Sequence, residues 1–592
     1  MCWESRPLAR LRGRREYDAR VTAILGLNAY HGDAAAALVV DGELVAAAEE
    51  ERFSRIKHVA GFPTLAAAWC LAEAGLDPAG IDHLAVSRDP RANTGRALSR
   101  TIRHGASARY LKARLDHAAE PRDVKAVLGE GLPAQVHDVE HHQAHVASAF
   151  LVSPFDEAAI LSVDGFGDFA STMTAAGSGS SYAVLDRVLF PHSLGMFYAA
   201  LTQWLGFPEY GDEGKVMGLA PYGDASRHIR HMRDVVQTHG DLFVLDLDYF
   251  THDKEGVDMT WDEGPPRIER IYSDKIIETF GPPRHEDDEL TAHHRDVAAA
   301  LQLRLEEVYL HLADRLRART GARNLCLAGG VALNAVANGR VVAHGGFDRV
   351  YVPPAAGDAG TAVGAALHVW NHELGNPRGF AMRDAYTGPA YGGDELAATI
   401  AARGLAAERL DETELARVVA GRIAEGDVVG WFQGRMEFGP RALGHRSIVA
   451  DPRRADMRQV LNERIKRRET FRPFGLSILA EALGEWFAHD TPSPFMELVH
   501  ELRPDRRPSI PAVDHVDHTG RVQTVERAVE PRYYALIEEF GRQTGVPILL
   551  NTSFNENEPI VMTPAEALDT FQKTRMDTLV LGDYVLRRDA AA

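Results

Sequence analysis

Two runs of apolar segments separated by polar turns lie in the first third of the chain. In each run, short apolar segments alternate with turns rich in Gly and Asp, such as Asp41-Gly42, a pattern that predicts antiparallel strands joined in hairpins. The predicted strands are 23–28, 34–40 and 43–48 in the first run and 159–168, 171–176 and 181–185 in the second. Recurrence of one hairpin unit predicts a duplicated fold with a cleft between its halves.

A long helix and a glycine turn follow in the middle of the chain. Apolar side chains recur at helical spacing over 297–312, and Gly321 is the predicted end of that helix. Next, the apolar strand 324–328 leads into the pair Gly329-Gly330. Glycine pairs let the backbone approach a ligand closely, commonly an adenosine, although they also close ordinary turns.

The composition changes around residues 380–394, where Gly, Pro, Tyr and Asp become frequent. Beyond this stretch the pattern predicts a helix at about 412–425 and a strand at 428–432, which open a second α/β domain. We therefore expect a disordered extension at 1–20, a first domain at 21–380, a linker at 381–395 and a second domain at 396–592.

Length and charge narrow the class of protein. The chain has 592 residues, 45% of them hydrophobic and 25% charged, which is ordinary for a globular enzyme. A net charge of -19 argues against nucleic acid as the main partner, because phosphate binding needs a basic surface. Three cysteines without a CxxC pair, no membrane-length apolar run and no signal-like N-terminus make the cytoplasm the expected location.

Four side chains of types that bind metals stand out. His141 and His145 lie one helical turn apart and would project from the same side of a helix, where two imidazoles can bind one ion. A lone HxxxH is also common as a pair of helix-surface or core histidines. Asp164 and Asp358 each lie where an apolar strand gives way to a glycine-rich turn. Two histidines and two carboxylates make a plausible site for a divalent metal.

A second group of side chains is basic. Arg441, Lys466 and Arg472 in an acidic protein would form an anion pocket for phosphate or carboxylate, and the alternative is surface ion pairs. The neighbouring Phe471, Pro473 and Phe474 favour a walled pocket. The locally basic segment 88–125 predicts a solvated helical face, or a lid near the cleft.

Eight short motifs occur in order between residue 21 and the C-terminus. They are GLNAYHGDAA at 26–35, EEERFSRIKH at 49–58, HHQAH at 141–145, LGFPEYGDEGKVMGLA at 205–220, GGVALN at 329–334, GPRALG at 439–444, KRRETFRPF at 466–474 and NTSFN at 551–555. Together these motifs resemble those of the NodU/CmcH family of O-carbamoyltransferases.

The resemblance implies an N-terminal actin-like (ASKHA) domain with a duplicated α/β fold, fused to a C-terminal YrdC-like α/β domain. In that family the YrdC-like domain condenses carbamoyl phosphate with ATP to carbamoyl-adenylate and releases pyrophosphate. The ASKHA domain then passes the carbamoyl group to a hydroxyl, usually on a sugar or another antibiotic scaffold. The implied partners are therefore carbamoyl phosphate, ATP with Mg²⁺ and a hydroxylated small molecule, with no nucleic acid or membrane. The sequence leaves the identity of the acceptor and the oligomeric state open, a homodimer included.

The resemblance also implies roles for individual residues. The implied metal ligands are His141, His145, Asp164 and Asp358, with Fe²⁺ the expected ion. His31 is the implied base for the acceptor hydroxyl, although it could merely line a turn beside Asp33. Arg441, Lys466 and Arg472 match the carbamoyl-phosphate and adenylate site, and Gly329, Gly330, Asn334 and Ser553 are the candidate nucleotide-binding residues. Lys57 and Lys215 either touch nucleotide phosphates or face solvent.

Three other activities compete with this interpretation. A threonylcarbamoyl transferase acting on tRNA shares both modules, but the net charge of -19 disfavours it. The hydrogenase-maturation carbamoyltransferase carries cysteine-rich zinc fingers, which three scattered cysteines cannot build. An ASKHA sugar kinase would need only magnesium on carboxylates and water, so the histidine pair would have no role in it.

Overall fold

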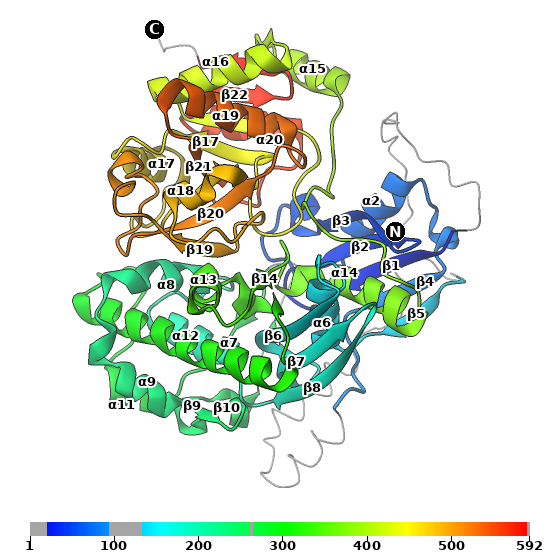
Figure 1. The fold of residues 1–592 in the computed structure, drawn as a ribbon, viewed down its shortest axis with the longest axis vertical. Helices are drawn as coiled ribbons and strands as arrows, with labels where there is room; N and C mark the ends of the chain where they lie inside the picture. Colours follow the sequence, from blue (N-terminus) through cyan, green and yellow to red (C-terminus); the bar gives the residue numbers. More distant parts are fainter. Residues whose placement is uncertain (1–20, 94–132, 257–258, 261–264, 589–592) are drawn as a thin grey trace.

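The computed structural model describes residues 21–93, 133–256, 259–260 and 265–588. The expected extension 1–20 and most of the basic segment 88–125 lie outside these residues. Within them the chain forms two five-stranded sheets, one nine-stranded sheet and two small two-stranded sheets, and helices cover the three large sheets (Figure 1). The predicted α/β class is therefore confirmed. No described helix is long and apolar enough to cross a membrane.

The two five-stranded sheets have the same strand order and the same strand directions. In each, a three-stranded antiparallel unit is extended on one side by two parallel strands. The first sheet has the order β3 (Glu43–Glu49), β2 (Ala35–Val40), β1 (Ala23–Asn28), β4 (His83–Val86) and β5 (Gln135–Asp138). The second has β8 (Ser181–Leu189), β7 (Ala170–Ser178), β6 (Glu157–Gly167), β13 (Asn324–Ala328) and β14 (Arg349–Tyr351). The duplicated fold predicted from the repeated hairpins is thus present.

Two short helices lie between these sheets, α6 (His141–Phe150) and α14 (Thr361–Leu367). They approach each other so closely that a Cβ atom on Gly364 would lie 1.9 Å from the carbonyl oxygen of Ala144. A Cβ atom on Gly26 of β1 would likewise lie 2.0 Å from the carbonyl oxygen of Ala362. Glycine allows this backbone-to-backbone contact, and the contact fixes the two helices against the first sheet.

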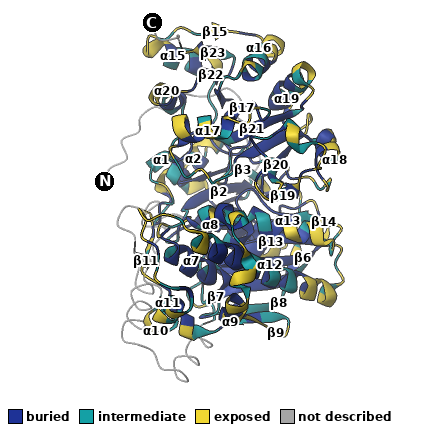
Figure 2. Cartoon of the chain, turned by 90° about the vertical axis from the view of Figure 1, so that its left-hand side faces the viewer, coloured by how far each residue is buried: buried dark blue, intermediate teal, exposed yellow. Residues whose placement is uncertain are grey.

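The other helices cover the outer faces of the sheets. The 29-residue α12 (Ala292–Thr320) buries Leu301 and Leu305 and ends at Gly321 in the left-handed conformation, as the pattern predicted. Buried residues concentrate in the sheets and on the helix faces that pack on them (Figure 2). The remaining longer helices of this half are α2 (Thr64–Ala74), α7 (Leu194–Trp204), α8 (Glu213–Leu219), α9 (Ile229–Val235), α11 (Asp274–Phe280) and α13 (Ala335–His344).

The nine-stranded mixed sheet forms the upper part of the molecule in Figure 1 and has a core of its own. Its strands, in order, are β15 (Glu408–Arg409), β23 (Tyr584–Arg587), β22 (Thr578–Leu581), β16 (Val429–Phe432), β17 (Arg446–Ala450), β21 (Ile548–Ser553), β18 (Gly475–Leu479), β20 (Thr519–Val525) and β19 (Leu498–Glu501). Its main helices are α15 (Gly393–Ala402), α16 (Glu412–Glu425), α17 (Met457–Leu461), α19 (Pro531–Thr544) and α20 (Pro564–Lys573).

The segment 381–395, which we expected to be a linker, is packed on both sides. The amide of Met382 donates to Val152 O at 2.8 Å, and the hydroxyl of Thr387 donates to Ala47 O at 3.0 Å, both in the first half of the chain. On its other side, the amide of Phe438 donates to Ala385 O at 2.7 Å. The division at 381–395 stays a proposal, and the segment holds the two halves together rather than tethering them loosely.

Candidate metal centre and anion site

The four side chains proposed as metal ligands converge on one point. The Nε2 atoms of His141 and His145 lie 3.1 and 3.0 Å from Oδ2 of Asp164 and 3.1 Å from each other. The same two nitrogens lie 3.6 and 3.4 Å from Oδ1 of Asp358. One ligand atom from each of the four residues therefore lies within 4.8 Å of all the others.

The four proposed ligand side chains are positioned by the secondary-structure elements that carry them. Both histidines come from α6, whose first turn begins at His141, and both are fully buried. Asp164 lies in β6 where the pairing with β7 shifts register between Val163 and Gly167, and such a bulge redirects a strand side chain. Asp358 begins the short helical turn that leads into α14. The sequence interpretation of two strand-end aspartates is therefore refined, because one aspartate sits in a bulge and the other at a helix start.

Backbone groups hold the surroundings of Asp164 and α6. The amide of Gly330 donates to Oδ1 of Asp164 at 3.0 Å, which leaves Oδ2 for the histidines. The carboxylate of Asp168 accepts the amide of His141 at 2.8 Å at the start of α6. Asp168 itself has a φ of 48°, in the left-handed region, so the turn after β6 is held in a costly conformation.

The two carboxylates at this centre, Asp164 and Asp358, favour the binding of a cation. Burial acts to lower the pKa of His141, but Asp164 and Asp358 outweigh it and raise that pKa to about 9. Burial likewise acts to raise the pKa of Asp164, yet hydrogen bonds from His141 and His145 bring it well below its usual range. Burial, followed by the charge of Asp164, raises the pKa of Asp358. Two buried carboxylates facing two imidazoles are a donor set that a divalent ion would neutralise.

The geometry also suits a transition metal. The two histidine nitrogens lie 3.0 to 3.6 Å from each other and from the carboxylate oxygens, and all four donor atoms lie within 4.8 Å of one another. Donor atoms at such separations can bind one ion at about 2 Å, the usual bond length for imidazole nitrogen and carboxylate oxygen. The residues therefore fit a divalent metal, and the donor set by itself admits iron, zinc or manganese.

His31 lies beside this centre, in the turn after β1. Its ring centroid is 4.9 Å from that of His141. The side chain is half-buried, so it borders both the metal centre and space open to solvent. This position is compatible with the predicted role of His31 as an acceptor base.

A second group that could hold a metal, Asp33, Glu51 and His58, lies nearby. Its atoms are largely engaged already, because Nδ1 of His58 lies 2.7 Å from Asp33 and the amide of His58 donates to Glu51 at 2.9 Å. These contacts fix the conformation of the 49–58 motif, in which His58 has a φ of 54°.

Lys466 is the centre of the anion site in the second half of the chain. It ends the π-helical turn Asn462–Lys466, a rare conformation that is frequent at functional sites. Its ammonium group is buried and donates to Ser553 O at 2.6 Å, Asn555 O at 2.8 Å and Asn555 Oδ1 at 2.6 Å. Burial, followed by the charges of Arg468, Lys57 and Arg472, holds its pKa well below the usual value.

Several further cations surround Lys466, and sequence reasoning missed two of them. Burial and then the charge of Arg472 lower the pKa of Arg468 to about 9, and burial and then Arg441 lower that of Arg521 to about 9. Guanidinium groups stay protonated at neutral pH even so. The cluster therefore carries a surplus of positive charge that an anionic ligand would neutralise. The sequence of β20 (Thr519–Val525) gives no local signal for Arg521, because only the pairing of β20 with β18 brings it to this place.

Arg441 links the anion site to the first half of the chain. Its Nε lies 3.0 Å from Oε1 of the buried Glu497, and its Nη2 donates to Leu333 O at 3.1 Å. Leu333 ends the glycine turn whose Gly330 holds Asp164. The cation cluster and the metal-type centre are thus joined through a single turn.

Lys57 approaches the cation cluster from the first half of the chain. Burial lowers its pKa, Glu51 opposes this, and Arg472 lowers it further. Lys57 is nevertheless an exposed residue, so it borders the cluster from the solvent side. Lys215 instead pairs with Asp212 at 2.9 Å and approaches Glu469 at 3.7 Å.

The candidate nucleotide residues divide between the two sites. Gly329 has a φ of 86°, and a Cβ atom there would lie 2.2 Å from Val163 O. The Gly329-Gly330 turn therefore packs closely against the strand that carries Asp164. Asn334 caps α13 by accepting the amide of Ala337 at 2.9 Å. Ser553 contacts Lys466 in the other site. In the structure the glycine turn holds the Asp164 carboxylate through the Gly330 amide. Its role in nucleotide binding stays a prediction.

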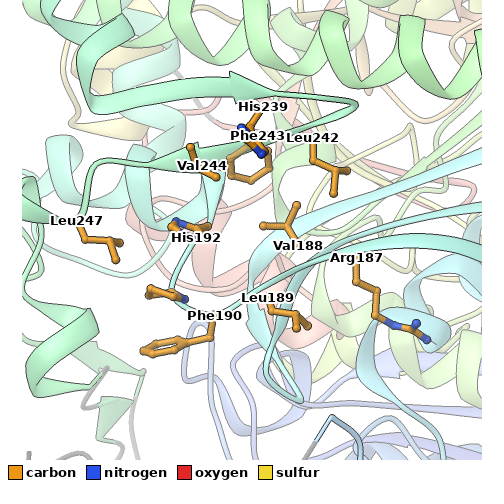
Figure 3. A pocket seen from close by; sticks show the side chains of 11 residues that line it. Arg187, Val188, Leu189, Phe190, His192, His239, Leu242, Phe243, Val244 and Leu247 are labelled. Atoms are coloured by element: carbon orange, nitrogen blue, oxygen red, sulfur yellow. The ribbon is translucent and has the colours of Figure 1, made fainter. Parts of the chain in front are cut away.

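One cavity of about 450 Å³ lies apart from both sites, between β8 and the hairpin β9 (Val236–His239) and β10 (Leu242–Leu245) (Figure 3). Its lining is mainly apolar, with Phe190, Phe243 and Leu247 in its walls. None of the proposed site residues lines it. Phe190 packs on Phe166, two residues beyond Asp164, at a ring-centroid distance of 5.0 Å.

Comparisons with known proteins cover nearly the whole chain. A family model described as the carbamoyltransferase N-terminus matches residues 23–367, and one described as the carbamoyltransferase C-terminus matches residues 420–588. The chain is 41% identical to an uncharacterised protein of Synechocystis sp., over 96% of this chain and 97% of that protein. It is 39% identical to nodulation protein NolNO of Sinorhizobium fredii, over 95% and 80% of the two chains. It is 30% identical to nodulation protein U of Rhizobium tropici, over 90% of each chain.

Proposed function

The chain belongs to the carbamoyltransferase family, and we propose that it is an ATP-dependent O-carbamoyltransferase that works through a carbamoyl-adenylate. The cation cluster in the second half would form the adenylate. The centre around His141 and His31 would transfer the carbamoyl group to a hydroxyl.

Activation begins with two anions that repel each other, carbamoyl phosphate and ATP. In a balanced reaction, water releases phosphate from carbamoyl phosphate, and the carbamate oxygen then attacks the α-phosphorus of ATP and expels pyrophosphate. Arg441, Lys466 and Arg472 would hold the phosphate groups and offset the charge that develops on them. Burial, followed by the charges of Arg468, Lys57 and Arg472, holds the pKa of Lys466 well below its usual value, and a bound anionic substrate would raise it again.

Transfer needs a good leaving group and a deprotonated acceptor. The acceptor oxygen would attack the carbamoyl carbon, the bond to AMP would break, and the hydroxyl proton would pass to the imidazole of His31. A divalent metal held by His141, His145, Asp164 and Asp358, with Fe²⁺ the expected ion, would supply Lewis-acid charge for the adenylate. Gly330 would keep the Asp164 carboxylate in place.

The observation that carries the proposal is the contact between the two sites. Arg441 donates to Leu333 O, and the turn ending at Leu333 also donates to Asp164 through Gly330. An adenylate made beside Arg441 would therefore arise next to the centre that uses it, which suits a short-lived acyl-phosphate intermediate.

For the acceptor we propose a hydroxylated natural product that carries a sugar, on the basis of the family resemblance. The net charge of -19 disfavours tRNA.

The decisive experiment separates the two half-reactions. Pyrophosphate release is measured with ATP and carbamoyl phosphate in the absence of any acceptor, and products are then identified by mass spectrometry with a panel of glycosylated acceptors. We expect pyrophosphate without acceptor, and a mass increase of one carbamoyl group on an accepted compound. Absence of pyrophosphate release from the folded, metal-loaded chain would disprove the adenylate route. Modification of tRNA in place of small glycosides would favour the competing threonylcarbamoyl-type activity.

A further inference from the structure

Both backbone polar groups of Gly439, in the loop that carries Arg441, are hydrogen-bonded to side chains from the other half of the molecule. Oε1 of Glu49 accepts the amide of Gly439 at 2.7 Å, and Nη2 of Arg52 donates to the carbonyl oxygen of the same residue at 2.7 Å. Glu49 and Arg52 are both buried. They lie 3.7 Å apart, and within the described residues the facing atoms, Oε2 of Glu49 and Nε of Arg52, make no hydrogen bond. Their close contacts therefore go to Gly439 rather than to each other.

Gly439 is a position that only glycine can occupy easily. Its φ is 108°, and a Cβ atom there would lie 2.4 Å from Pro354 O. Gly439 precedes Arg441 by two residues, and Pro354 precedes Asp358 by four. The loop that carries the anion-site arginine is thus wedged between the 49–52 segment and the loop that carries a proposed metal ligand.

Arg55, three residues after Arg52, makes a second set of contacts between the two halves of the molecule. Arg55 donates to Pro559 O at 2.6 Å and to Ile560 O at 2.9 Å, and it pairs with Glu566 at 3.2 Å. The 559–560 loop follows Asn555, the residue that accepts from Lys466. Arg55 itself follows the short helix α1 (Glu51–Ser54) with a φ of 62°, so its backbone is held in an uncommon conformation.

We infer that the segment 49–55 of the first half positions the activation site of the second half, with Glu49 and Arg52 setting the Arg441 loop and Arg55 setting the loop beside Lys466. These three are positioning residues, because they act on the site through backbone groups. The inference rests on the proposed adenylate-forming function for its kinetic part only. Its physical basis is that a charged group on a buried amide or carbonyl fixes that group far more firmly than a solvent-exposed contact would.

The inference predicts a specific kinetic signature. Removal of a charged hydrogen bond of this kind costs enough to weaken substrate binding by about tenfold to a hundredfold when it displaces a binding residue. We therefore expect the KM for carbamoyl phosphate in pyrophosphate release to rise by about tenfold or more in Arg52→Gln and in Arg55→Ala, with a smaller change in kcat.

The test uses the full chain and two readouts, steady-state pyrophosphate release without acceptor and hydrogen exchange of the peptides that span 437–446 and 556–562. Arg378→Gln is the matched control, because Arg378 also anchors a backbone carbonyl, that of Phe155 at 2.7 Å, but entirely within the first half. We expect faster exchange in 437–446 for Arg52→Gln and in 556–562 for Arg55→Ala. We expect the control to leave both peptides and the KM unchanged.

The outcomes are distinguishable. Native exchange rates together with a native KM in both variants would overturn the inference. The same changes in Arg378→Gln would also overturn it, because they would show a general loss of stability. If Arg52→Gln fails to fold, Arg55→Ala decides, since its side chain is 28% exposed. If the native chain releases no pyrophosphate, the proposed function fails, and hydrogen exchange alone decides whether the segment positions these loops.

Discussion

The substitution Gly330→Ala adds one methyl group beside a proposed metal ligand. A Cβ atom at this position would lie 2.8 Å from Oδ1 of Asp164, the oxygen that now accepts the Gly330 amide at 3.0 Å. Because real Cβ contacts almost never fall below 3.0 Å, the carboxylate must move by a few tenths of an ångström. The backbone itself can accept alanine, since Gly330 is not among the glycines with positive φ.

The size of the effect follows from the role of that contact. Groups that hold a metal ligand in place typically change metal affinity by about 10- to 100-fold when altered. We therefore expect metal binding to weaken by about 1.4 to 2.8 kcal/mol, with little change in the fold. Pyrophosphate release without acceptor should stay near the native rate, because the displaced carboxylate belongs to the transfer centre.

The assay is titration of metal-stripped chain with Zn²⁺ in competition with a chromophoric chelator. Gly346→Ala is the control, since the nearest atom to its added Cβ would be 3.7 Å away. Native affinity in folded Gly330→Ala would refute the reasoning about Asp164. If the KM for ATP rose instead while metal affinity stayed native, the glycine turn would serve the nucleotide, as the sequence suggested.

Three further predictions test the division of labour and the interface. Lys466→Met should lower pyrophosphate release by at least about 100-fold, because the ammonium group that would face the phosphates is lost; a native rate would remove Lys466 from the site. His141→Ala should keep that release and abolish carbamoyl transfer to an acceptor, as measured by product mass; loss of both would contradict two separate sites. For Glu49, burial raises the pKa to about 7, with Arg52 opposing and Glu51 adding to the rise. The folded state therefore binds a proton that the unfolded state releases near pH 4.5, so this stabilisation is complete below about pH 4.5 and is lost as the pH rises to about 7. Glu49→Gln should consequently gain stability relative to the native chain over that interval, by up to about 3 kcal/mol in denaturant unfolding; a pH-independent difference would contradict the raised pKa.

Local patterns predicted the elements well where one face of an element is buried. The paired hairpins, the helix that ends at Gly321 and the helix at 412–425 all occur where periodicity placed them. The spacing of apolar residues reflects which face of an element is buried, so a short stretch of sequence is enough to predict a helix or a strand. For the segment 381–395, the Gly- and Pro-rich composition predicts a linker, which stays a prediction, but it could not predict the contacts with Ala47 and Phe438 on the two sides of the segment.

Candidate site residues could be predicted from the sequence where they lie in a short motif with a characteristic spacing. His141 and His145 could be paired because one helical turn relates them, and the structure places both against Asp164 and Asp358. Arg521 and Glu497 gave no such signal. Arg521 lies in β20 and Glu497 directly precedes β19, so both reach the anion site only because these two strands pair in the nine-stranded sheet.

The sequence by itself therefore determined the α/β class, the duplication, the metal-type donor set and the basic character of the second site. Only the tertiary structure decided that Gly330 supports Asp164, that Arg441 touches the turn at Leu333, and that Glu49 and Arg52 grip Gly439. The physical reason is the distance along the chain between the interacting residues. Periodicity and motif spacing report contacts within a few residues, whereas these contacts join groups up to 390 residues apart whose backbone partners carry no side-chain signature.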